Sequence, residues 1–265
     1  MTQEQLPKIV VLSATAGYCH FKAGRDLAVR LAALNLGVEV HHLNNFDYSG
    51  TSVRVLMERT WSVASVSPGL RTFYSSLHRA AIASERFSNL FRNLHVFAAR
   101  KLEREFDDHE VLAVIALHPS AAAAASLWKR MRNFKLYSVA TDLVVHAMQC
   151  YKEIDQISAD RRAVIVSKAA INAKPESRMV LSGLPVSSQH YELVEGDRTS
   201  AKQVLVSFSA FGMRARNHIE KIVRLAELFP VIEFHFVCGN NSKLLEEVES
   251  RVADEDLVGR VVVHG

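Results

Sequence analysis

Near the start of the chain, a turn of small residues contains a cysteine and a histidine. The stretch SATAGYCHFKAG (13–24) follows the apolar run 9–12 and precedes a segment with helical spacing. A turn of this kind presents a phosphate or a sugar to backbone N–H groups, and it is usually rich in glycine. Here Cys19 and His20 stand where glycine is expected. Cys19 is either a tolerated small residue or a thiol that the helix N-terminus makes reactive.

Three further loops carry polar residues where an apolar run ends. They are 118–120, the pair Thr141 and Asp142 with His146 close behind, and 182–186. In open parallel sheets, ligands bind at the carboxyl ends of the strands, where loops and helix N-termini meet. We therefore expect these loops to meet the turn that contains His20.

The elements that must position these loops alternate between strands and helices. Apolar runs predict strands at 8–12, 38–43, 112–117, 134–140, 163–166 and 178–181. Helical spacing is found between several of them, over 22–36 with Gly37 as its stop, and from Pro119 onward. This alternation is typical of an α/β fold with a doubly wound parallel sheet that is covered on both faces.

The pattern restarts after a polar, acidic segment. We expect an N-terminal Rossmann-like domain over 1–190, a linker over 191–203 and part of a second Rossmann-like domain over 204–265. The second domain is predicted as strand, helix, strand, helix, strand, with strands at 204–208, 231–237 and 261–264. Because the pattern stops directly after a strand, we expect these residues to be the first half of that domain.

Composition excludes several classes of protein. The 265 residues are 49% apolar and 23% charged, which is typical of a globular protein. No apolar run approaches the roughly 18 to 20 residues of a membrane span, and the start MTQEQLPK lacks signal-peptide features, so we expect a cytoplasmic protein. The three cysteines are widely spaced without a CxxC pair, which predicts neither disulfides nor a metal site. Gly17 stands alone in its turn, so the missing GxGxxG pattern disfavours an NAD-dependent oxidoreductase.

Residues 51–105 are basic and rich in large apolar side chains. Nine arginine and lysine residues stand against four glutamates. A stripe with helical spacing consists of Phe87, Leu90, Phe91, Leu94 and Phe97, with Arg86, Arg92 and Arg100 elsewhere on the helical wheel. Two interpretations stay open: an amphipathic helix packed on the sheet, or an interfacial segment for an anionic membrane surface. Nucleic acid is disfavoured as a partner because no recognised binding module is present.

Four stretches resemble one family of glycosyltransferases. They are LSATAGYCHFKAG (12–24), VATDLVVHAMQ (139–149), VSKAAINAKPESRMVLSGLPVSSQ (166–189) and FVCGNNSKL (236–244). In this order they are similar to motifs of the monogalactosyldiacylglycerol synthases and the bacterial processive diacylglycerol glucosyltransferases. The resemblance covers essentially the whole chain. It implies the two-domain GT-B fold, with an acceptor-binding N-terminal half and a nucleotide-sugar-binding C-terminal half.

The resemblance also implies an activity and a set of site residues. It implies transfer of a hexose from a UDP sugar to a diacylglycerol-like lipid by a peripheral enzyme on an anionic membrane, without a cofactor or metal. His20 matches the family's general base, and Asp142 would orient the imidazole or stabilise its charge. The matching acceptor-binding residues are Thr15, Gly17, Tyr18 and His146. The matching donor-binding residues are Gly212, Cys238, Gly239 and Asn240. A histidine and an aspartate at strand ends also serve as loop caps.

The sequence departs from the family's pattern in three ways. Cys19 replaces a glycine of the first turn, and the loop 207–214 keeps only Gly212 where the family is glycine-rich. The family's ribose-binding carboxylate and its later proline-glycine motif would lie beyond Gly265. We therefore expect the 265-residue chain alone neither to bind UDP tightly nor to transfer a hexose. The alternative function is that of a non-catalytic descendant that retains a lipid-binding or partner-binding face.

Overall fold

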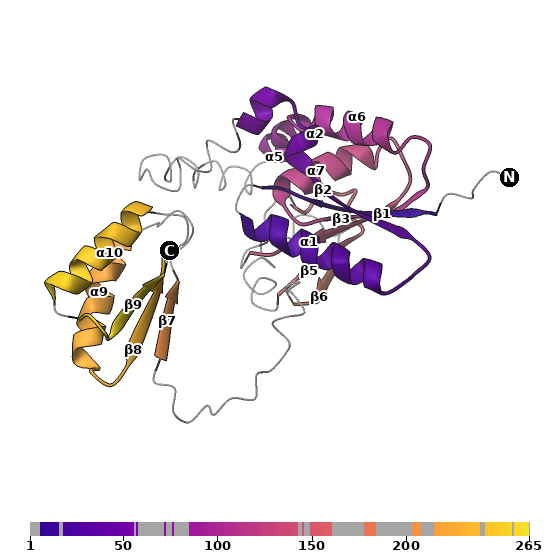
Figure 1. Ribbon diagram of the computed structural model, residues 1–265. Coiled ribbons are helices and arrows are strands. Elements are labelled where there is room, and N and C mark those ends of the chain that lie inside the picture. Colours follow the sequence, from indigo (N-terminus) through magenta and orange to yellow (C-terminus); the bar gives the residue numbers. More distant parts are fainter. Residues whose placement is uncertain are drawn as a thin grey trace. The chain divides into compact units, whose positions relative to one another are not determined.

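The computed structural model describes two compact units, one around a six-stranded sheet and one around a three-stranded sheet (Figure 1). The described residues are 6–15, 18–55, 57, 72, 76, 85–142, 145, 149–160, 178–183, 203–207, 215–238, 242–255 and 257–264. Of the expected linker over 191–203, only Gln203 is described, and it begins a strand. Each unit is treated below by itself.

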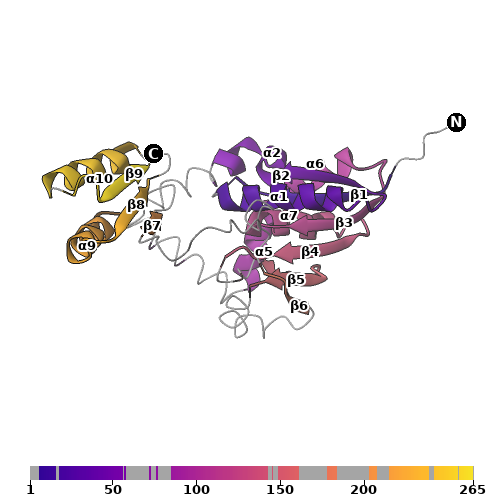
Figure 2. The ribbon, with the colours of Figure 1, turned by 60° about the horizontal axis from the view of Figure 1, so that its bottom comes forward.

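The first unit is built on a parallel sheet. Its strands are β1 (Lys8–Ser13), β2 (Glu39–Asn44), β3 (Val111–Ala116), β4 (Lys135–Val139), β5 (Gln156–Ala159) and β6 (Arg178–Leu181). Their order is β2-β1-β3-β4-β5-β6, and every neighbouring pair is parallel (Figure 2). The carboxyl ends of all six strands therefore lie at one edge of the sheet, as the sequence predicts.

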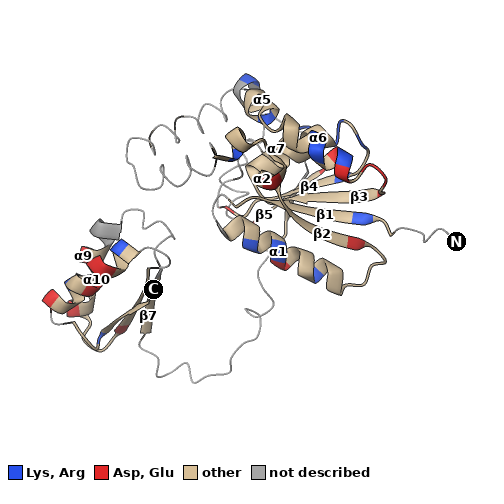
Figure 3. Cartoon of the chain, turned by 45° about the horizontal axis from the view of Figure 1, so that its top comes forward, with Lys and Arg blue, Asp and Glu red and all other residues tan. Residues whose placement is uncertain are grey.

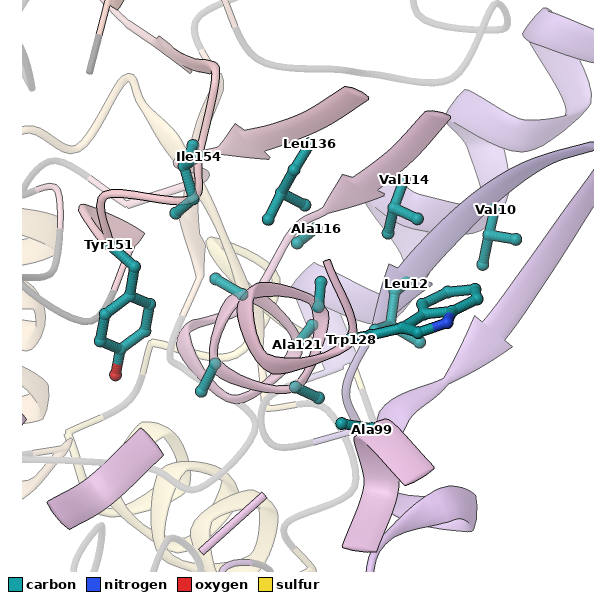
Figure 4. Close-up of a cluster of buried hydrophobic side chains, with 14 of the residues drawn as sticks. Val10, Leu12, Ala99, Val114, Ala116, Ala121, Trp128, Leu136, Tyr151 and Ile154 are labelled. Atoms are coloured by element: carbon teal, nitrogen blue, oxygen red, sulfur yellow. The ribbon is translucent and has the colours of Figure 1, made fainter. Parts of the chain in front are cut away.

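Helices cover both faces of this sheet, which confirms the predicted fold class. They are α1 (Tyr18–Ala33), α2 (Asn45–Tyr48), α5 (Glu85–Asn93), α6 (Val96–Glu105) and α7 (Pro119–Trp128). Side chains alternate along a strand, so Val11 packs on the α1 side, whereas Val10 and Leu12 join the cluster formed with α6 and α7 (Figure 4). Figure 1 shows α1 on one side of the strands, with α6 and α7 on the other.

Helix α7 forms the centre of the larger core. Residues 120–126 are all buried, and the run of alanines at 121–125 lets the helix approach the strands closely. At the end of α7, the fully buried Trp128 ring lies 5.6 Å from that of Phe106 and 5.0 Å from that of Phe134, measured between ring centroids. Its indole N–H donates to Glu103 at 2.6 Å. This core holds α6 and α7 against the sheet.

The second unit repeats the strand-helix alternation. Its elements are β7 (Gln203–Ser207), α9 (Ala215–Leu228), β8 (Glu233–Val237), α10 (Ser242–Asp254) and β9 (Val261–His264). The sheet order is β7-β8-β9, again parallel throughout. Phe234 and Phe236 of β8 pack against apolar side chains of α9 and α10, so both helices cover the same face. The predicted βαβαβ pattern is confirmed.

Several elements differ in detail from the prediction. Helix α1 begins at Tyr18, earlier than expected, and the four-residue strand β5 was not predicted at all. The strand expected at 163–166 lies outside the described residues. The predicted continuous apolar stripe is interrupted, because α5 ends at Asn93 and α6 begins at Val96. Among the helices described, none combines the length and the apolar character that a membrane crossing requires.

Candidate functional site

His20 lies in the first turn of α1, where three loops meet. Its imidazole Nδ1 is 3.0 Å from the Leu117 carbonyl oxygen and 2.6 Å from the Thr141 hydroxyl oxygen. Leu117 directly follows β3, and its own N–H donates to Leu12 of β1 at 3.0 Å. Thr141 lies just beyond the end of β4. The parallel sheet thus gathers residues more than 120 positions apart in sequence, and it buries the His20 side chain to 9% exposure.

These partners determine which nitrogen of His20 carries the proton in the neutral ring. A backbone carbonyl only accepts hydrogen bonds, so the Nδ1 atom facing Leu117 must be the donor. The Thr141 hydroxyl oxygen also contacts Nδ1 and accepts from the same N–H. The Nε2 atom of neutral His20 is therefore unprotonated and has a lone pair available for a hydroxyl proton.

The Asp142 carboxylate lies on the Nε2 side of this ring. Its Oδ2 atom is 3.7 Å from His20 Nε2, and the side chain is 65% exposed. In a serine-histidine-aspartate triad the carboxylate holds the opposite nitrogen of the imidazole. Here Leu117 and Thr141 perform that orienting role. Asp142 instead faces the nitrogen that would become charged, where it can stabilise an imidazolium, although solvent weakens the attraction at this exposure.

A second imidazole, that of His118, packs against His20. The two rings meet edge to face, with centroids 4.9 Å apart, and the Phe46 ring lies 6.2 Å from His118. His118 caps α7, because its Nδ1 accepts the N–H of Ser120 at 3.1 Å. In the neutral ring the proton is then on Nε2. His118 was not among the predicted site residues, although its loop was; the histidine-proline pair at a strand end is the signal that could have identified it.

Beside this group, the buried Ser13 and the partly buried His42 form a pair between β1 and β2. Ser13 Oγ is 2.8 Å from His42 Nε2, but Ser13 is fully buried and therefore cannot reach a substrate as a nucleophile. Burial, aided by the nearby Arg25 charge, lowers the pKa of His42, so this ring is neutral at pH 7. A Cβ atom at Gly24 would lie 2.9 Å from His42 Nε2 and 3.0 Å from Ser13 Cβ. Glycine at position 24 is thus required by close packing.

Among the described residues, no group of three or more histidine, cysteine, aspartate or glutamate side chains is arranged to hold a metal ion. The chemistry that the described site offers is that of acid and base side chains at the carboxyl edge of the first sheet.

Comparison with known proteins reveals similarity at the level of structure. Neither a protein-family model nor a curated protein sequence matches the chain. The structure of the lipopolysaccharide outer core galactosyltransferase WaaB is similar to this chain. The similarity covers 98% of this chain and 68% of WaaB, with TM-score 0.51 and 12% sequence identity. The similarity to a UDP-glucose:anthocyanidin 3-O-glucosyltransferase in complex with UDP covers 100% of this chain and 72% of that protein, with TM-score 0.52 and 10% sequence identity. The similarity to a glycosyltransferase from Rickettsia africae covers 99% of this chain and 69% of that protein, with TM-score 0.52 and 12% sequence identity.

The chain has the GT-B glycosyltransferase fold. This confirms the fold that the sequence resemblance implies. The narrower family of diacylglycerol glycosyltransferases is not among the structures named here. His20, Asp142 and His118 all belong to the first Rossmann-like unit of this GT-B chain.

The other predicted acceptor-binding residues surround the first turn of α1. Thr15 follows β1, is exposed and lines an open cavity. Tyr18 begins α1, but its side chain lies outside the described set, as do Gly17 and His146. Cys19 is exposed beside His20.

Of the predicted donor-binding residues, only Cys238 is described. Gly212, Gly239 and Asn240 lie outside the described residues. Cys238 directly follows β8, its side chain is fully buried in the core of the second unit, and its N–H donates to His264 at 2.8 Å. Burial raises the pKa of its thiol, with a smaller contribution from Glu249. The thiol therefore serves packing in the core of the second unit.

Proposed function

We propose that this protein transfers a hexose from a UDP sugar to a hydroxyl group of a diacylglycerol-like lipid. The observation that carries the proposal is the position of His20, buried at the carboxyl edge of the first sheet with an unprotonated Nε2. The GT-B fold supports sugar transfer, since the similar structures include a galactosyltransferase and a glucosyltransferase with bound UDP. The lipid acceptor rests on the sequence resemblance and on the surface of α5 and α6.

In this mechanism His20 acts as the general base. The acceptor hydroxyl donates to Nε2, and its proton moves there as the oxygen attacks the anomeric carbon. The new carbon–oxygen bond forms while the bond between the sugar and UDP breaks, and UDP leaves with the electron pair. The imidazolium then faces the Asp142 carboxylate at 3.7 Å. His118 supports the ring from its side; its own protonation at Nδ1 would remove the hydrogen bond that caps α7.

A partly apolar, basic surface on α5 and α6 supports a membrane-bound acceptor. Leu90 and Phe97 are each 61% exposed and Leu94 is 40% exposed. Arg86 and Arg100 are exposed on the same two helices, where Figure 3 shows basic residues on α5 and α6. We call these five residues the α5–α6 patch. Apolar side chains flanked by basic ones suit the boundary of an anionic bilayer.

One residue of the predicted basic set does not belong to this patch. Arg92 is only 7% exposed, and its guanidinium pairs with Glu153 at 3.2 Å. The stripe itself is also divided: Phe91 packs against the core, whereas Leu90, Leu94 and Phe97 face solvent. The packed-helix interpretation thus describes Phe91 and Arg92, and the exposed side chains are the ones that we propose for the membrane surface, because a helix that packs on a sheet buries only one side.

Vesicle binding tests the α5–α6 patch. Changing both Arg86 and Arg100 to glutamate should weaken binding to anionic vesicles by about 30-fold or more, since each basic side chain near such a surface contributes about 1 kcal/mol. Added salt should weaken the wild-type interaction too. The matched control reverses Lys135 and Lys152, which are exposed elsewhere in the unit. Equal co-sedimentation of both double variants would contradict a specific membrane face.

Transfer of radiolabelled hexose from UDP-hexose into diacylglycerol vesicles tests the reaction. The assay uses the 265-residue chain and the same chain completed by the nucleotide-binding half of a related glycosyltransferase. We expect labelled glycolipid from the completed protein. If that protein folds and binds UDP but transfers no sugar to any lipid hydroxyl, the proposal fails and the non-catalytic alternative is the better account.

A further inference from the structure

An open cavity of about 680 Å³ lies beside His20's helix, at the carboxyl end of β2. Its lining includes Thr15, Phe21 and, from β2, His42 and Asn44. Lys101 and Arg104 line the cavity from α6. All of these residues belong to the first unit, so the cavity does not depend on how the two units are arranged.

The carboxylates of this cavity already have partners. Glu105 accepts a hydrogen bond from the Tyr48 hydroxyl at 2.8 Å, and Asp47 pairs with Arg54 at 3.2 Å. By contrast, Lys101 and Arg104 form no ion pair with any residue in the described part of the chain. Their spacing of three residues on α6 brings both cations to one side of the helix. The two cations are therefore available to a ligand, whereas the carboxylates already accept hydrogen bonds from Tyr48 and Arg54.

The two lining residues from β2, Asn44 and His42, are uncharged, and Asn44 offers hydrogen-bond donors. The Asn44 side-chain oxygen accepts the N–H of Phe46 at 3.3 Å, which leaves the amide NH₂ group as a donor. His42 is neutral at pH 7 for the reasons given above, and its ring packs on that of Phe21 with centroids 4.7 Å apart. Donors and cations that are not committed to other partners favour a ligand group rich in oxygen and negative charge.

We propose that this cavity binds a phosphate group carried by a larger organic ligand. Arg104 offers a planar fork of donors that matches phosphate oxygens, and Lys101 adds a compact charge. The volume exceeds what a free phosphate ion fills, and the Phe21 ring provides an apolar surface for the rest of the ligand. A soluble phosphate ester and a phospholipid headgroup share this chemistry. His20 does not line this cavity, and binding there needs no UDP sugar.

Binding is measured on the whole chain by titration calorimetry at constant ionic strength. The probes are glycerol 3-phosphate, inorganic phosphate, and phosphatidylcholine vesicles with or without phosphatidic acid. Replacing both Lys101 and Arg104 by alanine should weaken glycerol 3-phosphate at least about tenfold, because hydrogen bonds to charged groups are among the stronger ones. Replacing Lys135 and Lys152 by alanine removes the same charge outside the cavity and should leave binding within about twofold.

A second variant tests the Asn44 amide donor of the cavity without disturbing the fold. Asn44→Asp keeps a good helix cap for α2 but replaces the amide donor by a carboxylate, so phosphate binding should fall while circular dichroism stays unchanged. Saturable binding of glycerol 3-phosphate supports a soluble ester. Binding only of phosphatidic acid vesicles, lost in the Lys101 and Arg104 variant, supports a headgroup. Absence of saturable binding to all probes, or equal loss in the control variant, would overturn the proposal.

Discussion

Replacing His20 by alanine should lower kcat for hexose transfer about 10²- to 10⁴-fold, the contribution that a general base typically makes. The loss follows from removing the imidazole whose Nδ1–H is bound by Leu117 and whose Nε2 is left to accept the proton. Acceptor binding should change little, so KM should stay nearly constant. Steady-state kinetics of the completed enzyme with lipid acceptor measure both quantities.

His20→Asn separates the chemical role from the structural one. The asparagine amide is able to donate to the Leu117 carbonyl, which Nδ1 contacts at 3.0 Å, but it supplies no base. We expect this variant to keep the thermal stability of the wild type and to lose activity like the alanine variant. Turnover by His20→Asn at the wild-type rate would remove His20 from the mechanism.

Arg92→Ala should destabilise the first unit by about 3 to 5 kcal/mol, because it breaks a buried ion pair and leaves a carboxylate without its partner. The Glu153 side chain is 9% exposed, and the Arg92 guanidinium also lies 5.0 Å from the centre of the Tyr151 ring. Arg130 contacts Glu153 at 2.5 Å from the exposed side, so the loss should fall toward the lower end of that range. Urea unfolding monitored by fluorescence gives the free-energy difference.

Arg86→Ala is the matched control for this measurement. Arg86 lies on the same helix α5 but is exposed, so its removal should change the free energy of unfolding by no more than about 0.5 kcal/mol. Equal midpoints for the two variants would contradict the buried pair. The comparison also shows why charge reversal at position 92 is unsuitable for testing membrane binding: lost stability would be mistaken for lost lipid affinity.

The sequence was most informative about the sheet. Continuous apolar runs such as 8–12 and 112–117 mark strands buried on both faces, and every predicted strand that falls on described residues matches an observed one. The strand β5 was not predicted because its four residues, QISA, alternate in burial and form too short a pattern. The helical stripe around Phe91 was seen, but periodicity alone cannot determine which side of it meets the core, so Arg92 was placed with the exposed arginines.

The candidate site was predictable in outline only. Because all strands are parallel, the loops that contain His20 and Thr141 had to approach each other, and they do. The tautomer of His20 depends on a carbonyl contributed by Leu117, and nothing in the side-chain sequence identifies a backbone acceptor 97 residues away. The cavity at β2 depends on how α6 packs beside α2, which no local pattern encodes.

Helix α7 also constrains the order in which the protein can fold during synthesis. Its run of alanines is covered on one side by α6, which precedes it in the chain, and on the other by strands that include β4, which follows it. A nascent chain that ends before Val139 therefore exposes an apolar helix with half of its packing partners missing. Such a chain is a natural binding target for chaperones until β4 emerges from the ribosome.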